Sequence, residues 1–390
     1  MDIRYFSAPG RVEIGGNHTD HQHGRVLAAA VGLEISAAVK PNILNTVRLR
    51  TQGDGSLVFS TEHKGTVPLC STTIVDLNTL DVQSGETGTS AALVRGVGAW
   101  FIENGYAIGG FDADLSSTIP IGAGLSSSAA FAVLIGNIFK GLYGGDVSPL
   151  EIARAGQFAE NVYFGKPCGL MDQTISSCGG LNIIDFESPQ TPIVTPINAK
   201  LPGYTMCIVS TGGSHVDLTD DYAACNSEMR AVAAHFGKGY LREVCESDFY
   251  SSISDLRYLG DRAVLRAIHF FEENKRVLKQ AKALEKGNIK SFLDMVNESG
   301  RSSLAYLQNV FSPSNPQEQG LTLALSLSEQ MLTGVGAWRV HGGGFAGTIL
   351  AFVPDDLKAE YERRMTSVFG DGCCLFLSIR KEGGGEKCKV

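Results

Sequence analysis

The chain has 390 residues, of which 43% are hydrophobic and 19% charged, so it is long enough for two folded domains and is not composed like a disordered protein. Its net charge of −8 and its pI near 5.5 argue against a nucleic-acid or anionic-membrane partner. No apolar run reaches the roughly 18 residues that a membrane-spanning helix needs, and residues 1–6 lack a signal-peptide core. Nine cysteines, an odd number without zinc-binding spacing, indicate reduced thiols, so we expect a cytoplasmic protein.

The first segment, residues 7–24, is dense in polar side chains and precedes a strand-like run from Val26 to Val39. Loops between buried strands often carry function. Four side chains of metal-binding type stand close together here: His18, Asp20, His21 and His23. A metal site is the less favoured interpretation, because a strand or loop points neighbours in different directions and the helical His-x-x-x-His spacing is missing. We favour fixed donors and acceptors for a polyol, with Arg11 as a permanent positive charge.

Residues 40–83 are expected to form strands and loops with little chemical signal, and a turn at residues 85–90 precedes a helix over about 91–104. Residues 111–119 then alternate like a strand and lead into Pro120-Ile-Gly-Ala-Gly-Leu-Ser-Ser-Ser-Ala-Ala130. An apolar helix follows to about Tyr143.

This strand, glycine loop and helix predict a polyphosphate site. Gly122 and Gly124 let a phosphate approach the backbone, and the serine-rich first turn offers free N–H groups at the positive end of a helix dipole. The motif is not a Walker A loop, because no Gly-Lys pair here is followed by Ser or Thr. The alternative is a tight turn with a serine that only caps the helix.

The next helix is expected to begin at Ser148 and Pro149, with Ser148 as N-cap, and to run to about Tyr163 with Glu160 on it. Asp172 follows a glycine loop in apolar surroundings. A lone Asp in such a place is often only a helix N-cap. The functional alternative is a carboxylate held at a reacting hydroxyl.

Four prolines between residues 189 and 202 indicate a boundary, so we divide the chain into domains 1–198 and 199–390. The second domain begins with an apolar strand, Tyr204–Ser210, and continues with a long helix that carries Tyr222. A packed aromatic is the ordinary role for such a tyrosine. Residues 255–310 are strongly helical in pattern.

Gly342, Gly344 and Gly347 match Gly-x-Gly-x-x-Gly, the pattern of a dinucleotide-binding loop. We reject that interpretation, because the strand-like run 348–353 follows where a helix would be required. Three consecutive glycines between strands fit a loop that passes close to another backbone or a ligand. The polar, glycine-rich tail from Lys381 is expected to be mobile.

Three glycine motifs in this order resemble the GHMP kinases, and the first segment narrows the resemblance to galactokinases. Their hallmark is similar to Gly10-Arg-Val-Glu-Ile-Gly-Gly-Asn-His-Thr-Asp-His21. The Pro-x-Gly-x-Gly-Leu-Ser-Ser-Ser-Ala motif is complete, and Cys168-Gly-Leu-Met-Asp-Gln173 and Gly342-Gly-Gly-Phe345 also match. The likeness extends over most of the chain.

The resemblance implies roles for individual residues. Arg11 would stabilise charge near the transferred phosphoryl group, and Asp172 would be the catalytic base at the anomeric hydroxyl. Sugar contacts are expected from Asn17, His18, Thr19, Asp20, Gly169, Asp172 and Tyr222. ATP contacts are expected from Gly122, Ala123, Gly124, Leu125, Ser126, Ser127, Ser128 and Gly343. Magnesium ligands are expected from Ser128 and Glu160.

The sequence departs from the galactokinase pattern in the first segment. The family's sugar-binding Glu is Asn17 here, the family's Asn is Glu13, and the family's Tyr is His21. A carboxylate would repel an acidic sugar, whereas an amide can donate to a hydroxyl or a carboxylate. The Asp20–Gly24 run also resembles galacturonate kinases. The aromatic that relatives place near adenine is Ser90 here, which leaves nucleotide preference open.

The resemblance implies an α+β fold of two domains, the first similar to the second domain of ribosomal protein S5 and the second ferredoxin-like, with the active site in the cleft between them. The implied reaction is ATP- and Mg²⁺-dependent phosphorylation of D-galactose at its C1 hydroxyl. The alternatives are a sugar-1-kinase for a related sugar such as galacturonate and a non-catalytic galactose and ATP sensor. Expected partners are the sugar and ATP, without nucleic acid or membrane, and we expect a monomer.

Overall fold

The computed structural model describes residues 2–52, 70–120, 122–213 and 218–387. Part of the predicted strand and loop region, residues 53–69, lies outside the described residues. The chain forms two compact units. The first unit comprises residues 1–11, 29–180 and 379–390, and the second comprises residues 12–28 and 181–378.

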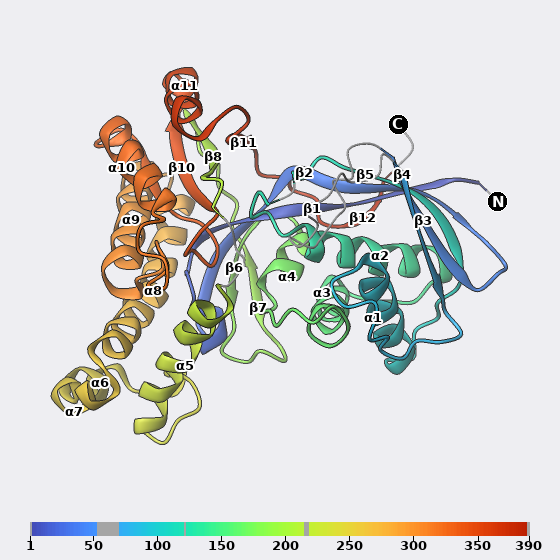
Figure 1. The fold of residues 1–390 in the computed structure, drawn as a ribbon, viewed down its shortest axis with the longest axis horizontal. Coiled ribbons are helices and arrows are strands. Elements are labelled where there is room, and N and C mark those ends of the chain that lie inside the picture. Colours follow the sequence, from blue (N-terminus) through green and yellow to red (C-terminus); the bar gives the residue numbers. More distant parts are fainter. Residues whose placement is uncertain (1, 53–69, 121, 214–217, 388–390) are drawn as a thin grey trace. The chain divides into compact units, whose positions relative to one another are not determined.

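The first unit is built on a mixed sheet whose strands follow the order β12-β1-β2-β5-β3-β4 (Figure 1). Neighbours β1 and β12, β2 and β5, and β3 and β4 are antiparallel, whereas β3 and β5 are parallel. The strands are β1 (Arg4–Gly15), β2 (Arg25–Pro41), β3 (Thr46–Gln52), β4 (Cys70–Asp76), β5 (Phe111–Ser117) and β12 (Gly385–Lys387). Residues 12–15 of β1 and 25–28 of β2 belong to the second unit.

Four helices lie on one face of this sheet: α1 (Ser90–Glu103), α2 (Ser127–Tyr143), α3 (Pro149–Phe158) and α4 (Met171–Cys178). Helix α2 is buried continuously from Ser128 to Phe139, so its apolar sequence reflects burial on all sides. Helix α3 begins at the predicted N-cap Ser148, which also forms a capping box with Glu151. Its α-helical part ends at Phe158, and a π-helical turn over Ala159–Phe164 carries the helix on to about the predicted end. Local widening of this kind often marks functional sites.

The second unit contains an antiparallel sheet of order β11-β8-β10-β9 and a hairpin of β6 and β7. Its strands are β6 (Leu181–Asp185), β7 (Ile193–Pro196), β8 (Tyr204–Ser210), β9 (Ala337–Val340), β10 (Thr348–Pro354) and β11 (Cys374–Leu377). Its helices are α5 (Thr219–His235), α6 (Glu246–Ser251), α7 (Ile253–Leu256), α8 (Asp261–Glu285), α9 (Ile289–Ser302), α10 (Gly320–Leu332) and α11 (Lys358–Phe369). The predicted strands at 204–210 and 348–353 are confirmed, as is the helical pattern after residue 255.

The compact units differ from the division at residue 198 that the prolines suggested. The first hairpin passes from one unit to the other and back, and the last strand of the chain returns to β1. Local composition cannot reveal this path of the chain, because the path depends on strand pairing between the two ends of the chain. The predicted mobile tail is wrong up to residue 387: it contains β12, and Glu386 forms an ion pair with Arg4 at 2.6 Å.

None of the helices in the described part of the chain is long and apolar enough to cross a membrane. The seven cysteines whose side chains are described are all free thiols, and Sγ of Cys373 lies 3.8 Å from Sγ of Cys374.

Candidate functional site

The loop between β5 and α2 is here called the serine loop and comprises residues 120–126 without Ile121. Its backbone alternates in the sign of the φ angle. Gly122, Gly124 and Ser126 have positive φ angles of 73°, 70° and 58°, whereas Ala123 and Leu125 between them do not. Alternation between right- and left-handed residues turns successive N–H groups toward one concave side, which is a common anion-binding arrangement. Gly122 and Gly124 are exposed, and Ala123 and Leu125 are buried, so the glycines form the open side of the loop.

The start of helix α2 leaves donors at the end of the serine loop. The first intrahelical bond runs from the Ala130 N–H to the Ser126 carbonyl, so the N–H groups of the three preceding residues point out of the helix N-terminus. Ser126 is the N-cap residue, but its side chain makes no capping hydrogen bond. Its hydroxyl donates instead to Oδ2 of Asp172. The Ser126 side chain therefore does not act as a helix cap, which was the alternative interpretation of the serine motif.

Arg11 and Asp172, 161 positions apart in the sequence, form a bidentate ion pair within the first unit. Arg11 Nε lies 2.6 Å from Asp172 Oδ1, and Arg11 Nη2 lies 3.0 Å from Oδ2. Arg11 Nη1 donates to the Gly124 carbonyl at 2.7 Å, and the Arg11 N–H donates to the Leu125 carbonyl. The serine loop thus fixes the guanidinium, and the guanidinium fixes the carboxylate.

Asp172 is not a helix cap. Leu170 is the N-cap of α4, and Asp172 is the second residue of that helix. Burial disfavours the carboxylate, but the charge and hydrogen bonds of Arg11, with Lys166 and Ser126, lower its pKa to about 2. The group is therefore fully ionised at neutral pH.

Glu160 lies in the π-helical turn, where its buried carboxylate meets several side chains of the first unit. The Ser128 hydroxyl donates to Oε1, and the Gln173 amide donates to Oε2. The Cys168 thiol lies 3.5 Å from Oε2, and the Lys166 ammonium lies 3.8 Å from Oε1. A hydroxyl and a carboxylate oxygen in direct contact form a donor set that suits Mg²⁺, which prefers few protein oxygens.

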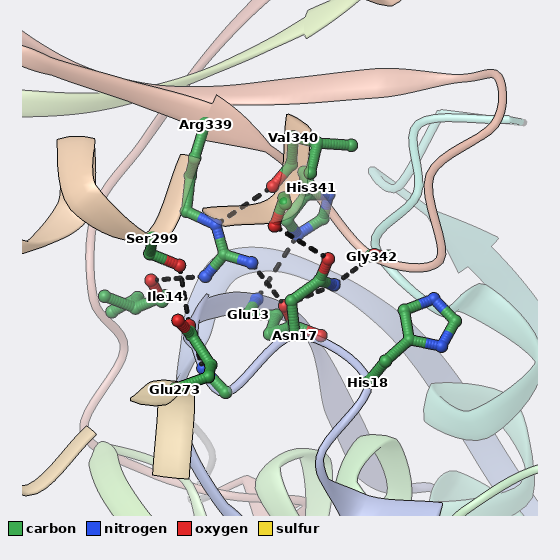
Figure 2. Close-up of polar contacts among 12 residues, drawn as sticks. Glu13, Ile14, Asn17, His18, Glu273, Ser299, Arg339, Val340, His341 and Gly342 are labelled. Carbon is green, nitrogen blue, oxygen red and sulfur yellow. Dashed lines mark hydrogen bonds and ion pairs between the residues drawn. The ribbon is translucent and has the colours of Figure 1, made fainter. Parts of the chain in front are cut away.

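The Asn17 side chain, in the second unit, is fully buried and its amide groups have protein partners. Its Nδ2 donates to the Gly342 carbonyl at 2.6 Å and to Glu13 Oε1 at 3.0 Å (Figure 2). Its Oδ1 accepts from Asn309 Nδ2 at 2.8 Å and from Ser303 Oγ at 3.3 Å. A sugar group would have to replace one of these partners to bind the amide, so the predicted sugar contact stays a prediction.

Glu13, four residues before Asn17, carries a second buried polar side chain of this segment. Glu13 forms a buried ion pair of 2.9 Å with Arg339, whose Nη1 also donates to the Ile14 carbonyl at 2.7 Å (Figure 2). Nearby in the same figure, Glu273 accepts from the Gly16 N–H at 3.0 Å and from Ser299 at 2.6 Å. These contacts hold the segment that precedes His18.

The tautomers of His18 and His21 follow from their partners. A carbonyl only accepts, so His18 Nε2, 2.9 Å from the Gly343 oxygen, carries the proton. His18 Nδ1 therefore accepts from His21 Nε2 at 3.1 Å, and His21 Nδ1 accepts from the Gln22 amide at 3.3 Å. Burial lowers the pKa of His18 to about 4 and that of His21 well below its usual value, so both rings are neutral.

The other residues that were predicted to contact the sugar have these positions in the structure. The Thr19 hydroxyl contacts the Gly16 and Arg25 carbonyls, and Asp20 begins a short 3-10 turn, Asp20–Gln22. The Tyr222 hydroxyl donates to the Gly344 carbonyl at 3.0 Å, and burial raises its pKa to about 12. Gly169, in the first unit, is exposed. Among the side chains of the described residues, no cluster of three or more His, Cys, Asp and Glu is arranged to hold a metal ion.

Two family models match the chain. Residues 90–180 match the GHMP kinases N-terminal domain, and residues 2–41 match the galactokinase galactose-binding signature. The chain carries a GHMP kinase N-terminal domain. This domain contains the serine loop, Glu160 and Asp172, while Arg11 lies in the signature. The resemblance predicted from the motifs is thereby confirmed.

Solved structures of GHMP kinases share the fold. A galactokinase from Lactococcus lactis, solved in complex with galactose, has 24% identity and a TM-score of 0.80 over 99% of this chain and 95% of that one. The Methanococcus jannaschii mevalonate kinase has 15% identity and a TM-score of 0.65, over 97% and 98% of the two chains. The Streptococcus pneumoniae phosphomevalonate kinase has 11% identity and a TM-score of 0.63, over 97% and 100%. The predicted α+β fold of a GHMP kinase is confirmed.

Three contacts of these residues are not evident from the sequence. The Ser126 hydroxyl, expected at ATP, donates to Asp172. Arg339 pairs with Glu13, which stands out in the sequence only as a departure from the family pattern. Lys166 lies near Glu160, and the signal for it is a lysine between Gly165 and Pro167, close to Cys168.

Proposed function

We propose that the protein transfers the γ-phosphoryl group of ATP to the C1 hydroxyl of D-galactose, giving galactose 1-phosphate and ADP. The observation that carries the proposal is the Arg11–Asp172 pair, joined through Ser126 and Gly124 to a loop suited to phosphate. The match of residues 2–41 to a galactose-binding signature supports galactose as the acceptor.

In the proposed reaction the C1 oxygen attacks the γ-phosphorus, and the bond between this phosphorus and the β,γ-bridging oxygen breaks. The hydroxyl proton passes to Asp172. A carboxylate with a pKa of about 2 is a weak base, so it suits a loose transition state in which the proton leaves late. Arg11 keeps the carboxylate ionised and oriented, and its charge stabilises the oxygen as it loses the proton.

The serine loop and the first turn of α2 would bind the ATP phosphates through Gly122, Ala123, Gly124, Leu125, Ser126, Ser127 and Ser128. We also assign Gly343 to the nucleotide, as the resemblance implies. Ser128 and Glu160 would hold Mg²⁺, which neutralises charge on the phosphate oxygens when it is bound. The sugar would be contacted by Asn17, His18, Thr19, Asp20, Gly169, Asp172 and Tyr222.

A coupled assay of ADP release with a panel of sugars tests the proposal. Galactose should be turned over, with glucose, mannose and galacturonate as competitors in the panel. Asp172→Asn should lower kcat by about 10²- to 10⁴-fold, the usual contribution of general base catalysis. Asp114→Asn, which changes an exposed aspartate on β5, is the matched control and should leave kcat unchanged.

The outcomes separate the alternatives. Turnover of galacturonate without turnover of galactose would replace the proposed substrate with an acidic sugar. Binding of galactose and ATP without turnover of any sugar would point to a sensor and refute the kinase. Full activity of Asp172→Asn would remove Asp172 as the base.

A further inference from the structure

Lys166 stands beside both carboxylates of the proposed phosphoryl-transfer site. Its ammonium lies 3.8 Å from Glu160 Oε1, and its positive charge lowers the pKa of Asp172. A lysine side chain is protonated at neutral pH, so Lys166 places a positive charge beside Glu160.

The Lys166 head group is not committed to a protein partner. At 3.8 Å its contact with Glu160 is too long for a hydrogen bond, and no hydrogen bond of the ammonium to another described residue is found. Its side chain is 51% exposed, whereas that of Glu160 is 1% exposed. A loose, half-exposed ion pair of this kind contributes little to stability.

The backbone that carries Lys166 is fixed. The Lys166 N–H donates to the Glu160 carbonyl at 3.0 Å, where Gly165 closes the π-helical turn with a φ of 81°. A rigid backbone with a flexible four-carbon stem places the ammonium near one point while leaving it free to turn.

Arg11 has much less freedom to bind phosphate. Its Nε, Nη1 and Nη2 all donate to protein acceptors, two of them on Asp172. Its charge is largely balanced by that carboxylate. The triphosphate of ATP carries more negative charge than one Mg²⁺ neutralises, and Lys166 is placed to supply a further positive charge near the serine loop.

We propose that the Lys166 ammonium turns away from Glu160 and binds the γ-phosphoryl group of the nucleotide, donating charge-assisted hydrogen bonds to the phosphate oxygens. The assignment rests on the proposed function, and it adds a residue that lies outside the motifs of the family resemblance. In the transfer step Lys166 gains and loses no proton. It stabilises the negative charge that the three peripheral oxygens carry while the bond to ADP breaks.

Equilibrium titration calorimetry with two nucleotides tests this assignment without any sugar. ADP lacks the γ-phosphoryl group, and the β,γ-imido analogue of ATP carries it. Lys166→Met should weaken binding of the analogue by about tenfold to a hundredfold, the usual effect of a charge-assisted hydrogen bond, and should change ADP binding less than about twofold. Lys166→Arg should restore most of the analogue affinity.

Lys40→Met is the matched control, because Lys40 is an exposed lysine on β2 of the same unit, and it should bind both nucleotides like the wild type. Equal weakening of ADP and analogue in Lys166→Met would show a structural role through Glu160 and overturn the assignment. Unchanged binding of both nucleotides would overturn it as well. If the wild type distinguishes the two nucleotides through Lys166 but phosphorylates no sugar, the proposed function fails while the Lys166 assignment stands.

Discussion

At the scale of single residues, the chemistry depends on how Asp172 is held. Arg11 supplies two hydrogen bonds and Ser126 a third, so both carboxylate oxygens are oriented. These contacts lower the pKa of Asp172 and weaken it as a base. In exchange, they keep the group in one ionisation state and one position, which is what late proton transfer requires.

Ser126→Ala tests whether this serine acts through Asp172. The variant loses the hydrogen bond to Oδ2 but keeps the backbone of the serine loop. We expect kcat to fall roughly fivefold, which corresponds to about 1 kcal/mol, while ADP affinity stays within about twofold.

A double-mutant cycle supplies the control for Ser126. In the Asp172→Asn background the serine has no carboxylate to orient, so Ser126→Ala should then cost little further activity. If the two effects on kcat multiply in full, Ser126 does not act through Asp172.

Glu13 and Asn17, where the sequence departs from the galactokinase pattern, are in contact with each other. Glu13 pairs with Arg339, and Asn17 donates to that same carboxylate, so the two residues share one hydrogen-bonded cluster. The cluster fixes the backbone before His18, whose φ of 55° is left-handed. Both departures from the galactokinase pattern therefore have packing partners in this chain.

At the scale of elements, the serine loop joins β5 to α2 through alternating left-handed positions. Gly122 has a φ of 73°, and a Cβ at this position would meet no atom within 4 Å. Any cost of a larger residue comes from backbone conformation alone, roughly 1–2 kcal/mol. The same is true of Gly105, with a φ of 80° after helix α1.

Gly122→Ala and Gly105→Ala form a matched pair. Both should lower the free energy of unfolding by about 1–2 kcal/mol in urea titrations. Gly122→Ala alone should also weaken ADP binding, by about tenfold, because a shifted peptide turns an N–H away from the phosphates. Equal ADP binding by the two variants would mean that the loop does not hold phosphate.

At the scale of the whole molecule, acid should destabilise the two units at different pH. Burial holds the pKa of His18 at about 4 and lowers those of His21 and His269, all in the second unit. Because the unfolded chain binds these protons more readily, stability is lost as pH falls from about 6.5 toward 4. The carboxyls of Asp172 and Glu273, each with a pKa of about 2, cost stability only below about pH 4.

The two tryptophans make this difference measurable. Trp100 lies in the first unit and Trp338 in the second, so Trp338→Phe and Trp100→Phe each leave one fluorescent reporter. Between pH 7 and 5 the urea midpoint reported by Trp338 should fall more than that reported by Trp100. His18→Asn should flatten the decrease at Trp338. Identical pH dependence at both reporters would contradict the histidine argument.

The sequence was sufficient to predict the local structure that depends only on neighbouring residues. The cap of α3 at Ser148, the strand at 204–210 and the glycine turns depend on neighbours within a few residues, so their patterns were sufficient. The family motifs also named Arg11 and Asp172, each with its own role. Only the tertiary structure showed that the guanidinium meets both oxygens of the carboxylate, across 161 positions.

The wrong prediction has the same cause. The tail after residue 381 was expected to be mobile, because nothing in its composition shows that β1 pairs with it as a strand. The division at residue 198 stays a prediction, and no boundary in composition marks the places where the compact units cross β1 and β2. Local propensity and capping are fixed by adjacent residues, whereas strand pairing, buried ion pairs and the surroundings of Lys166 depend on which distant segments the fold brings together.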